Sequence, residues 1–305
     1  MSNRGRPLFD LLVCPTCMSE LSHCGETLIC QREGREFPVI RGVPRFVESD
    51  SYVRSFSFEW NMHQTTQLDT FRQDGSSEDI FRKKTGFAPQ DLRGKLVLDA
   101  GIGAGRFTDT MARWGANVIG VDLSYAVEAA KENFGHLNNV LVAQADIARL
   151  PFKPETFDAI VSIGVLHHTP DTKKYFQALI PHLRRGGSIA IWVYPAEGDF
   201  LTRKQWIRFT SRIPDRMFYE WCRWFVPYAQ ARISNLLIQS IYRVFPFSCQ
   251  GLGLENDILD TFDGYSPRFH GIHTPQEVET WFKEAGLVDI HIPGPWDTSM
   301  RGTRP

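Results

Sequence analysis

A glycine-rich turn directly after an apolar run constrains the fold of this chain more than any other feature. Residues 96–105 read Leu-Val-Leu-Asp-Ala-Gly-Ile-Gly-Ala-Gly, so Asp99 ends the run and is followed by Gly101, Gly103 and Gly105. Glycine readily adopts a positive φ and lets a ligand approach the backbone where a Cβ would otherwise stand. The turn therefore predicts a nucleotide site. A dinucleotide fingerprint needs a third glycine three residues after Gly103, where this chain has Arg106, so the spacing argues against NAD.

Four further apolar runs alternate with helical patterns, at residues 116–122, 140–143, 157–163 and 187–194. Strands that alternate with helices predict a doubly wound parallel sheet, which binds its ligands at the carboxyl edge. Two of the runs lead into acidic side chains at that edge. Asp122, 17 residues after Gly105, is placed to accept both hydroxyls of a ribose, and Asp146 is placed to accept the amino group of adenine.

The order and spacing of these motifs resemble those of one known family. Asp99, Asp122 and Asp146 are followed by Leu-His-His at 166–168 and by Leu-Arg-Arg-Gly-Gly at 183–187. Together they resemble a class I S-adenosylmethionine-dependent methyltransferase of the type 11 kind, over roughly residues 53–305. The expected fold is α/β, with a doubly wound, mostly parallel, Rossmann-like sheet, a small N-terminal β-rich knuckle domain, and a helical insertion after the fifth strand.

The resemblance also implies which residues hold the cofactor. The glycine turn would wrap the methionine moiety with Asp99 beneath it, Asp122 would hold the ribose, and Asp146 with Ile147 would hold the adenine. The complete implied set in this core is Asp99, Gly101, Gly103, Gly105, Asp122, Leu123, Asp146, Ile147 and Gly164. A plainer role stays open for each acidic residue, because Asp99 and Asp146 can cap turns and Asp122 can cap the helix that begins at Ser124.

Four cysteines within the first 30 residues predict a metal site rather than disulfides. Cys14 and Cys17 form a Cys-Pro-Thr-Cys knuckle, and a second knuckle contains Cys30. Two knuckles of thiolates chelate a tetrahedral ion such as zinc.

Residues 8–47 are similar to the small Trm112-like, zinc-ribbon-type domain, in which a cysteine usually stands at the position of Glu33. Because of that departure, Cys24 or His23 becomes the candidate for a fourth ligand. The alternative is a domain that contains no metal. So small a unit hardly folds alone, and without metal it would have to pack against the main domain.

Composition limits the partners and divides the chain. A net charge of −1 provides no basic field that would recruit nucleic acid. The sequence has no apolar leader and no apolar run of about 18 residues, so we expect a cytoplasmic location. We divide the chain into a Trm112-like domain (1–50), a cofactor-covering segment with a linker (51–94), the cofactor-binding core (95–199), a helical lid insertion (200–250), and a C-terminal part that completes the sheet and carries a substrate loop (251–305).

Residues 53–69 precede the first strand of the core and are expected to fold over the cofactor. Trp60, His63 and Gln67 are the candidates to contact it, since cations favour aromatic faces. The alternative is an amphipathic helix packed on the sheet.

The insertion at 200–247 carries aromatic residues at helical spacing among many arginines, and it contains three prolines that are expected to divide it into separate helices: Pro214, Pro227 and Pro246. Such a stretch is a packed core, a lid over the active site, or a contact with a membrane surface. We expect a lid that walls off an apolar pocket beside His168, together with Tyr265, His270 and His273. After this loop, Thr274 and Glu277 predict a capping box, and residues 287–292 return to the sheet.

Methyl transfer from a sulfonium is an in-line displacement, so the protein must chiefly align the nucleophile with the methyl group. A hydroxyl acceptor also uses a base, and the candidates are His167, His168, His273 and Tyr265; His168 alternatively only shapes the pocket. Three functions fit the sequence. The first is a methyltransferase for a small molecule or glycoconjugate, directed to oxygen. The second is an RNA methyltransferase with a zinc-ribbon-type targeting module, and the third is a non-catalytic cofactor-binding or interaction protein.

Overall fold

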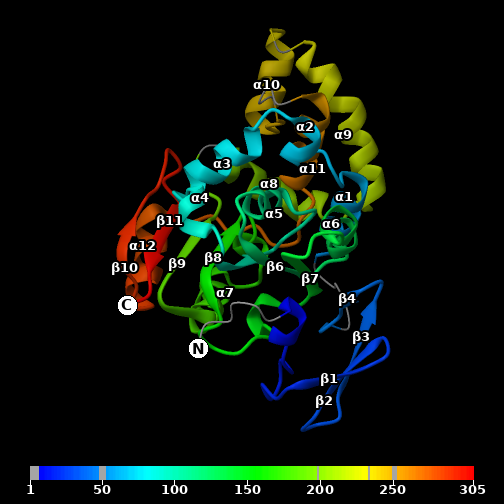
Figure 1. Cartoon of the computed structure of the whole chain (residues 1–305). Coiled ribbons are helices and arrows are strands. Elements are labelled where there is room, and N and C mark those ends of the chain that lie inside the picture. Colours follow the sequence, from blue (N-terminus) through cyan, green and yellow to red (C-terminus); the bar gives the residue numbers. More distant parts are fainter. Residues whose placement is uncertain (1–6, 48–52, 198, 233, 249–252) are drawn as a thin grey trace.

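The computed structural model describes residues 7–47, 53–197, 199–232, 234–248 and 253–305, and within these ranges the chain forms two β-sheets. The small sheet has the order β1-β2-β3-β4, and the large sheet has the order β10-β11-β9-β8-β5-β6-β7 (Figure 1). The expected domain boundaries at 50/51 and 250/251 lie outside the described residues.

The large sheet has the expected doubly wound, mostly parallel architecture. Its parallel strands are β5 (Leu96–Ala100), β6 (Asn117–Asp122), β7 (Val140–Gln144), β8 (Phe157–Ile163) and β9 (Leu183–Trp192). At the other edge, β11 (Ser299–Thr303) runs antiparallel between β9 and β10 (Val288–His291). The sequence predicts the return of β10 but misses β11, whose five residues have no apolar alternation. A Cβ on its Gly302 would lie 2.8 Å from the Phe282 ring, so helix and strand pack too closely there for a side chain.

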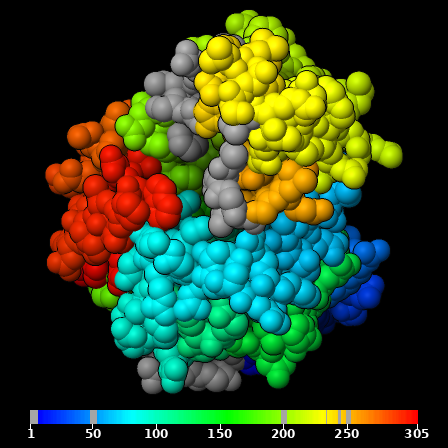
Figure 2. All heavy atoms as spheres, turned by 90° about the horizontal axis from the view of Figure 1, so that it is seen from above, coloured from blue at the N-terminus to red at the C-terminus, as the bar shows by residue number. Residues whose placement is uncertain are grey.

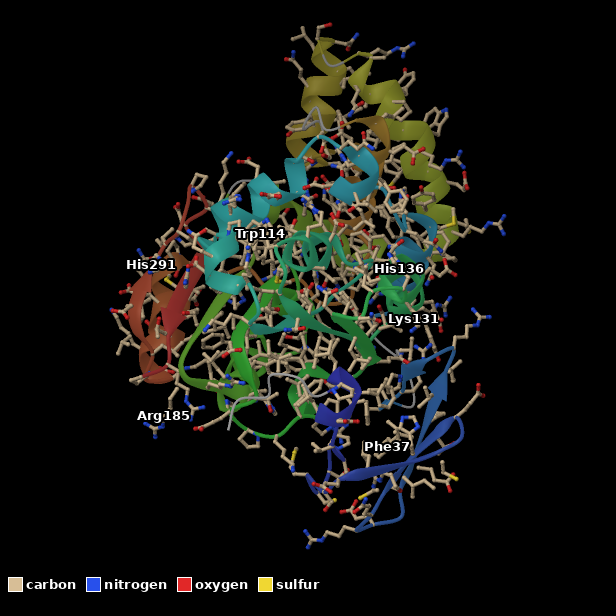
Figure 3. All side chains as sticks on the ribbon, viewed as in Figure 1. Phe37, Trp114, Lys131, His136, Arg185 and His291 are labelled. Atoms are coloured by element: carbon tan, nitrogen blue, oxygen red, sulfur yellow. The ribbon has the colours of Figure 1, made fainter. Side chains whose placement is uncertain are left out.

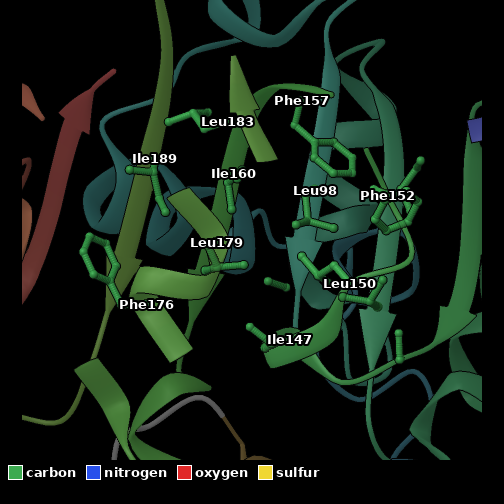
Figure 4. Packing of buried hydrophobic residues seen from close by; sticks show 14 of the residues in the cluster. Leu98, Ile147, Leu150, Phe152, Phe157, Ile160, Phe176, Leu179, Leu183 and Ile189 are labelled. Carbon is green, nitrogen blue, oxygen red and sulfur yellow. The ribbon is translucent and has the colours of Figure 1, made fainter. Parts of the chain in front are cut away.

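Alternate residues of the central strands pack against helices on opposite faces of the sheet. Leu98, Ile160 and Ile189 face α7 (Thr172–Leu179) and α12 (Pro275–Glu284), and Figure 4 shows this layer. On the other face, Val97, Val161 and Ala190 pack against α3 (Ser76–Thr85) and α5 (Arg106–Arg113). This period of two is what a strand buried on both faces requires. The predicted capping box at Thr274 and Glu277 begins α12 and is confirmed.

Further helices complete the core: α1 (Arg54–Met62), α2 (Asp69–Arg72), α4 (Pro89–Leu92) and α6 (Ala126–Phe134). Short 3-10 turns lie at η1 (Leu8–Leu11), η2 (Ile147–Arg149), η3 (Leu166–His168) and η4 (Ile180–His182). In Figure 1, α1, α2 and the insertion lie over the end of the sheet opposite the small domain.

The small domain packs directly against the large one. It consists of η1 with β1 (Leu21–Cys24), β2 (Thr27–Cys30), β3 (Glu36–Ile40) and β4 (Val43–Pro44). Its buried Leu12, Leu28 and Phe37 belong to the same core cluster as Phe152 and Phe157 of the large domain (Figure 3 labels Phe37).

A buried arginine joins the two domains. Arg45 is 4% exposed, and its Nη1 donates to Gln144 Oε1 at 3.2 Å while its Nη2 pairs with the Glu128 carboxylate. The backbone N–H of Phe46 donates to the carbonyl of Gln144 at 2.8 Å, next to this pair. The junction therefore combines an apolar core with a charged hydrogen bond.

The insertion forms a helical unit with its own core. It contains α8 (Asp199–Thr210), α9 (Asp215–Gln230) and α10 (Leu236–Val244), and α11 (Leu254–Asp263) follows. Buried side chains of α9 and α11 pack together with Phe58 of α1. The expectation that Pro227 separates two helices is wrong, because Pro227 lies inside α9, whereas Pro214 and Pro246 lie outside helices.

Part of the insertion leaves an apolar surface exposed. Met217, Trp221, Trp224 and Tyr228 follow one face of α9 and are exposed, with Leu236 and Leu237 at the start of α10. The α9–α10 hairpin projects from the body of the molecule (Figure 1). Among the residues described, no helix combines the length and the apolar character that crossing a membrane requires.

The Arg45 junction predicts a stability difference between two arginine variants of the small domain. Replacing Arg45 with alanine removes the buried partner of Glu128 and should lower the free energy of unfolding by about 2–4 kcal/mol. The matched control is Arg35→Ala, on the exposed surface of the same domain, which should change it by less than about 0.5 kcal/mol. Denaturant titration followed by tryptophan fluorescence measures both, and equal losses would contradict the junction.

Candidate active site

A cavity of about 370 Å³ lies where the parallel strands of the large sheet end. Residues at the carboxyl ends of the five parallel strands, or within two residues after them, line it: Gly101, Asp122, Asp146, Gly164 and Tyr194. The side chains that cover it come from α1, α3, α8 and α11. Seen from above, the surface is hollowed between the C-terminal strands (red), the segment that includes α3 (cyan) and the insertion (yellow) (Figure 2). The sheet thus gathers its site residues at the edge where doubly wound folds bind ligands.

The glycine turn adopts the backbone that its sequence predicts. All three glycines have positive φ, 94° at Gly101, 53° at Gly103 and 97° at Gly105. A Cβ would lie 2.3 Å from Val165 at Gly101 and 2.1 Å from Phe134 at Gly105, so close packing as well as φ requires glycine. Gly101 and Gly103 line the cavity, whereas Gly105 serves as the N-cap of α5.

Two carboxylates hold the turn in place, one within β5 and one at the end of β6. Gly103 N–H donates to Asp122 Oδ2 at 2.9 Å, while Ser124 donates to Asp122 Oδ1 from its N–H and its hydroxyl. Asp99 accepts a hydrogen bond from the Thr108 hydroxyl at 2.6 Å beneath the turn, and burial raises the pKa of Asp99 to about 7. Asp122 lines the cavity, so its structural and ligand-facing roles are compatible.

The third acidic residue is also both a cap and a lining residue. Asp146 accepts a hydrogen bond from the Ala148 N–H at 2.9 Å, which begins η2, and it lines the cavity with Ile147 and Leu123. Asp146 therefore caps η2, which is the plainer role that the sequence left open, and it also lines the cavity.

Helix α1 covers the glycine turn. A Cβ on Gly103 would lie 3.3 Å from the Trp60 indole, and both Trp60 and Gln67 line the cavity. Gln67 Nε2 donates to Asn256 Oδ1 at 3.3 Å and so links the covering segment to α11. His63 lies elsewhere, because its Nε2 is 2.5 Å from the Tyr219 hydroxyl of α9 and it is not among the residues that line the cavity.

Of the four candidate bases, the structure brings His168 to the cavity. Its Nδ1 lies 3.0 Å from the carbonyl of Phe269, so the proton sits on Nδ1 and the unpartnered Nε2 carries the lone pair. Burial lowers the pKa of His168 to about 4. The imidazole is therefore neutral at pH 7 and a weak base.

The other three candidates lie behind the cavity wall. His167 is fully buried against Tyr194, with ring centroids 3.7 Å apart. His273 Nε2 is 2.9 Å from the Thr172 hydroxyl, and the Tyr265 hydroxyl donates to the carbonyl of Pro246 at 2.7 Å inside the core of the insertion. None of the three, nor His270, is among the lining residues. The expected pocket wall of Tyr265, His270 and His273 is wrong, since packing uses these side chains instead.

Five polar side chains that line the cavity are not predicted as site residues from the sequence. They are Glu59, Lys84, Arg203, Asp260 and Asp263. Lys84 lies in the segment 51–94, which the sequence assigns to a cover and a linker. Its Nζ lies 3.1 Å from the centroid of the Trp192 ring. Burial lowers the pKa of Lys84 well below the ordinary value of a lysine. No motif marks these positions, because helices from three separate parts of the chain bring them together.

The small domain contains a compact group of possible metal ligands. One ligand atom each from Cys14, Cys17, Cys30 and Glu33 lie within 4.8 Å of one another. The predicted convergence of the three cysteines is confirmed. Cys24 is exposed at the end of β1 and does not belong to the group, so the fourth position falls to the Glu33 carboxylate.

Comparison with known proteins identifies the core. Residues 98–191 match the family described as "Methyltransferase domain". The ubiquinone biosynthesis O-methyltransferase of Cupriavidus pinatubonensis is 33% identical over 103 residues, which are 33% of this chain and 41% of that protein. The tRNA U34 carboxymethyltransferase of Pseudomonas paraeruginosa is 37% identical over 117 residues, which are 37% of this chain and 36% of that protein. The chain thus spans less than half the length of these curated relatives.

Two solved structures extend the comparison. One is a chain from a complex that contains the Haloferax volcanii Trm112 methyltransferase activator, with a TM-score of 0.47 and 14% identity over 82% of this chain and 97% of the other. The other is Haemonchus contortus phosphoethanolamine N-methyltransferase 2 with S-adenosyl-L-methionine, with a TM-score of 0.42 and 18% identity over 80% of this chain and 43% of the other. The chain contains a methyltransferase domain, to which β5 to β9 and the glycine turn belong.

The buried imidazole of His168 predicts a pH dependence of stability. Its pKa is about 4 in the folded chain against an ordinary 6.5, so the unfolded chain takes up this proton first as the pH falls. The stability that the neutral ring contributes above about pH 6.5 is then lost towards pH 4. His168→Gln, which removes the titrating ring, should reduce the drop in unfolding free energy between those pH values by about 2–3 kcal/mol.

Unfolding titrations at a series of pH values measure this difference. The control is His136→Gln, at an exposed position labelled in Figure 3, which should leave the pH profile unchanged. A His168→Gln profile that overlays the wild-type profile would show that the ring is not held neutral by burial.

Proposed function

We propose that this chain is an S-adenosylmethionine-dependent methyltransferase that acts on a small-molecule acceptor. The observation that carries this proposal is the cavity at the carboxyl edge, in which the glycine turn of the methyltransferase domain meets Asp122, Asp146 and the cover of α1. A cavity with charged groups beyond the turn supports an enzyme over a protein that only binds the cofactor.

The residues around the turn fit the parts of the cofactor. Glycine at 101 and 103 leaves the backbone open to the methionine moiety, Asp122 supplies oxygens for the ribose, and Asp146 with Ile147 borders the position for adenine. Trp60 presents an aromatic indole beside Gly103, where a sulfonium is attracted to the ring face. When bound, the cofactor supplies an activated methyl group.

The part of the cavity beyond the turn fits an acceptor. His168, Trp192 and Tyr194 line it together with Arg203 of α8. These residues position the acceptor and exclude water, which is the main task in an in-line displacement. A neutral His168 shapes this wall and is too weak a base to carry the reaction by itself. The sequence predicts an oxygen acceptor; the carboxylates described below favour nitrogen.

The insertion contributes to this wall through α8. Arg203 lines the cavity, while α9 packs behind α1 and α11, where Phe58 meets Tyr219 and Phe262. We therefore assign the lid role to α8 and α11, with α9 as their support. The membrane-surface contact, one of the alternatives for the insertion, stays untested and would fall to the exposed face of α9.

The alternative acceptor is RNA, since one set of relatives is described as tRNA U34 carboxymethyltransferases. The net charge of −1, which provides no basic field for nucleic acid, favours a small molecule. Methyl transfer to total tRNA, measured beside transfer to a low-molecular-weight cell extract, distinguishes the two.

The cysteine group of the small domain fits a structural zinc ion. Three thiolates and a carboxylate oxygen are a donor set that zinc accepts in tetrahedral geometry. Cys14, Cys17, Cys30 and Glu33 would hold it, which is compatible with the Trm112-like character of this domain. A bound zinc ion and the packing against the large domain would then both stabilise the small domain.

Cofactor binding is predicted to depend on the open backbone at Gly103. A leucine there would force a side chain at φ 53° into the space that Trp60 borders, so Gly103→Leu should abolish binding of S-adenosylmethionine and S-adenosylhomocysteine. The control is Gly94→Leu, at a similar φ of 67° with open space around it. Titration calorimetry on both variants, with NAD as a ligand that should not bind, tests the assignment; unchanged affinity in Gly103→Leu contradicts it.

Metal content is predicted to follow the observed cysteine group. The purified chain should carry about one equivalent of zinc by mass spectrometry, and Cys17→Ser should lose it. Cys24→Ser replaces an exposed cysteine of the same domain and should keep it. Zinc lost equally from both variants, or absent from the wild type, rejects the site.

A further inference from the structure

Three carboxylates meet at one wall of the cavity. Glu59 comes from α1, and Asp260 and Asp263 lie one turn apart on α11. All three line the cavity, on the side opposite the residues that fit the ribose and adenine. The methyltransferase motifs do not account for any of them.

Two of these groups have oxygens without a protein partner. Glu59 is fully buried, and neither of its carboxylate oxygens has a hydrogen-bond partner; the same holds for the buried Oδ1 of Asp263. A buried carboxylate oxygen that lacks a donor is costly, so native proteins seldom leave one unless a ligand supplies the donor. Both residues belong to the lining of the cavity.

The cations of the wall act on Asp260 and Asp263 or contact other groups, and none of them acts on Glu59. Arg106 donates to the Ser77 hydroxyl at 3.0 Å and acts on Asp260 through charge, Arg203 acts on Asp263, and Lys84 lies over the Trp192 ring. The Tyr194 hydroxyl donates to Asp263 Oδ2 at 3.2 Å, and Asn256 donates to Asp260 Oδ2 at 3.2 Å. Both carboxylate oxygens of Glu59 and Oδ1 of Asp263 are thus the acceptors that lack a hydrogen-bond donor.

We propose, on the basis of the function proposed above, that the acceptor is a small-molecule amine whose ammonium group binds to Glu59 and Asp263, and that its nitrogen receives the methyl group. A protonated amine offers several N–H donors on one atom and a positive charge, which matches neighbouring carboxylates better than a neutral hydroxyl does. Trp192 and Trp296 give the rest of the wall an aromatic surface for the body of such an acceptor.

The same carboxylates account for the proton. An ammonium nitrogen has no lone pair, so it must first give a proton to a base. Burial, together with the charges of Asp263 and Asp260, raises the pKa of Glu59 well above its ordinary value, which suits it to accept that proton. The nitrogen lone pair then forms the N–C bond, the C–S bond breaks with its electron pair left on sulfur, and the product is an N-methylammonium ion. Glu59 finally loses its proton to solvent.

The test uses the full chain, carbon-13 methyl-labelled S-adenosylmethionine and a low-molecular-weight cell extract. Carbon-13 NMR distinguishes methyl groups on nitrogen from those on oxygen. We expect N-methyl signals, and a fall of about 10- to 100-fold in their rate of formation in Glu59→Gln and in Asp263→Asn. Both variants remove an ionisable carboxyl group without changing the shape of the side chain, so S-adenosylhomocysteine affinity by calorimetry should stay within about 3-fold of wild type and also reports folding. The control is Glu255→Gln, an exposed position on α11, which should keep the wild-type rate.

Three outcomes overturn the proposal. Methyl signals on oxygen or carbon, or none at all while S-adenosylhomocysteine still binds, reject an amine acceptor and leave the proposed cofactor site intact. A loss of S-adenosylhomocysteine affinity in Glu59→Gln with a retained N-methylation rate would assign these carboxylates to the amino group of the cofactor. A wild-type chain that binds no cofactor would instead reject the proposed function itself.

Discussion

The hydrogen bond from Gly103 N–H to the Asp122 carboxylate ties together the parts of the chain on which the cavity depends. It joins the turn after β5 to the end of β6, so the backbone of the turn is fixed relative to the neighbouring strand. Three further lining residues lie around this edge: Asp146 and Gly164 follow the adjoining strands, and Trp60 covers the turn. A turn that moved would lose the cofactor side of the cavity while the sheet beneath it stayed folded.

The opposite wall of the cavity has a different physical basis. There, helices α1, α8 and α11 bring acids and bases together out of water, and the structure keeps oxygens of Glu59 and Asp263 without donors. The apolar core shared by α1, α9 and α11 holds these groups in place, since Phe58 packs against Tyr219 and Phe262. Packing energy from the insertion thus offsets the unfavourable burial of charge at the wall.

The sequence predicts the cofactor side of the site far better than the acceptor side, for a physical reason. Gly101, Gly103, Asp122 and Asp146 lie at or within three residues of strand ends, and parallel strands must bring their carboxyl ends to one edge. The cysteine knuckles similarly fix the convergence of Cys14, Cys17 and Cys30 over a short loop.

Residues whose positions depend on long-range packing cannot be predicted from strand ends or short motifs. The histidine and tyrosine that seem suited to a pocket, His273 and Tyr265, are used in packing, while Glu59 and Asp263 reach the cavity through the mutual placement of two helices distant in sequence. Strand β11 is missed for the same reason, because its pairing with β9 and the close approach of Phe282 to Gly302 replace the local pattern that normally marks a strand.

The division between the two walls coincides with the extent of the family match. Residues 98–191 contain β6 to β8 and most of β5 and β9, which carry the turn and the acids that fit a nucleoside. Glu59, Arg203, Asp260 and Asp263 all lie outside that range, on elements that pack as a separate helical unit. A chain built in this way can change its acceptor by altering the helices while the strands continue to bind the same cofactor. For that reason the chemistry of the acceptor has to be inferred from the charges on the helices and not from the shared domain.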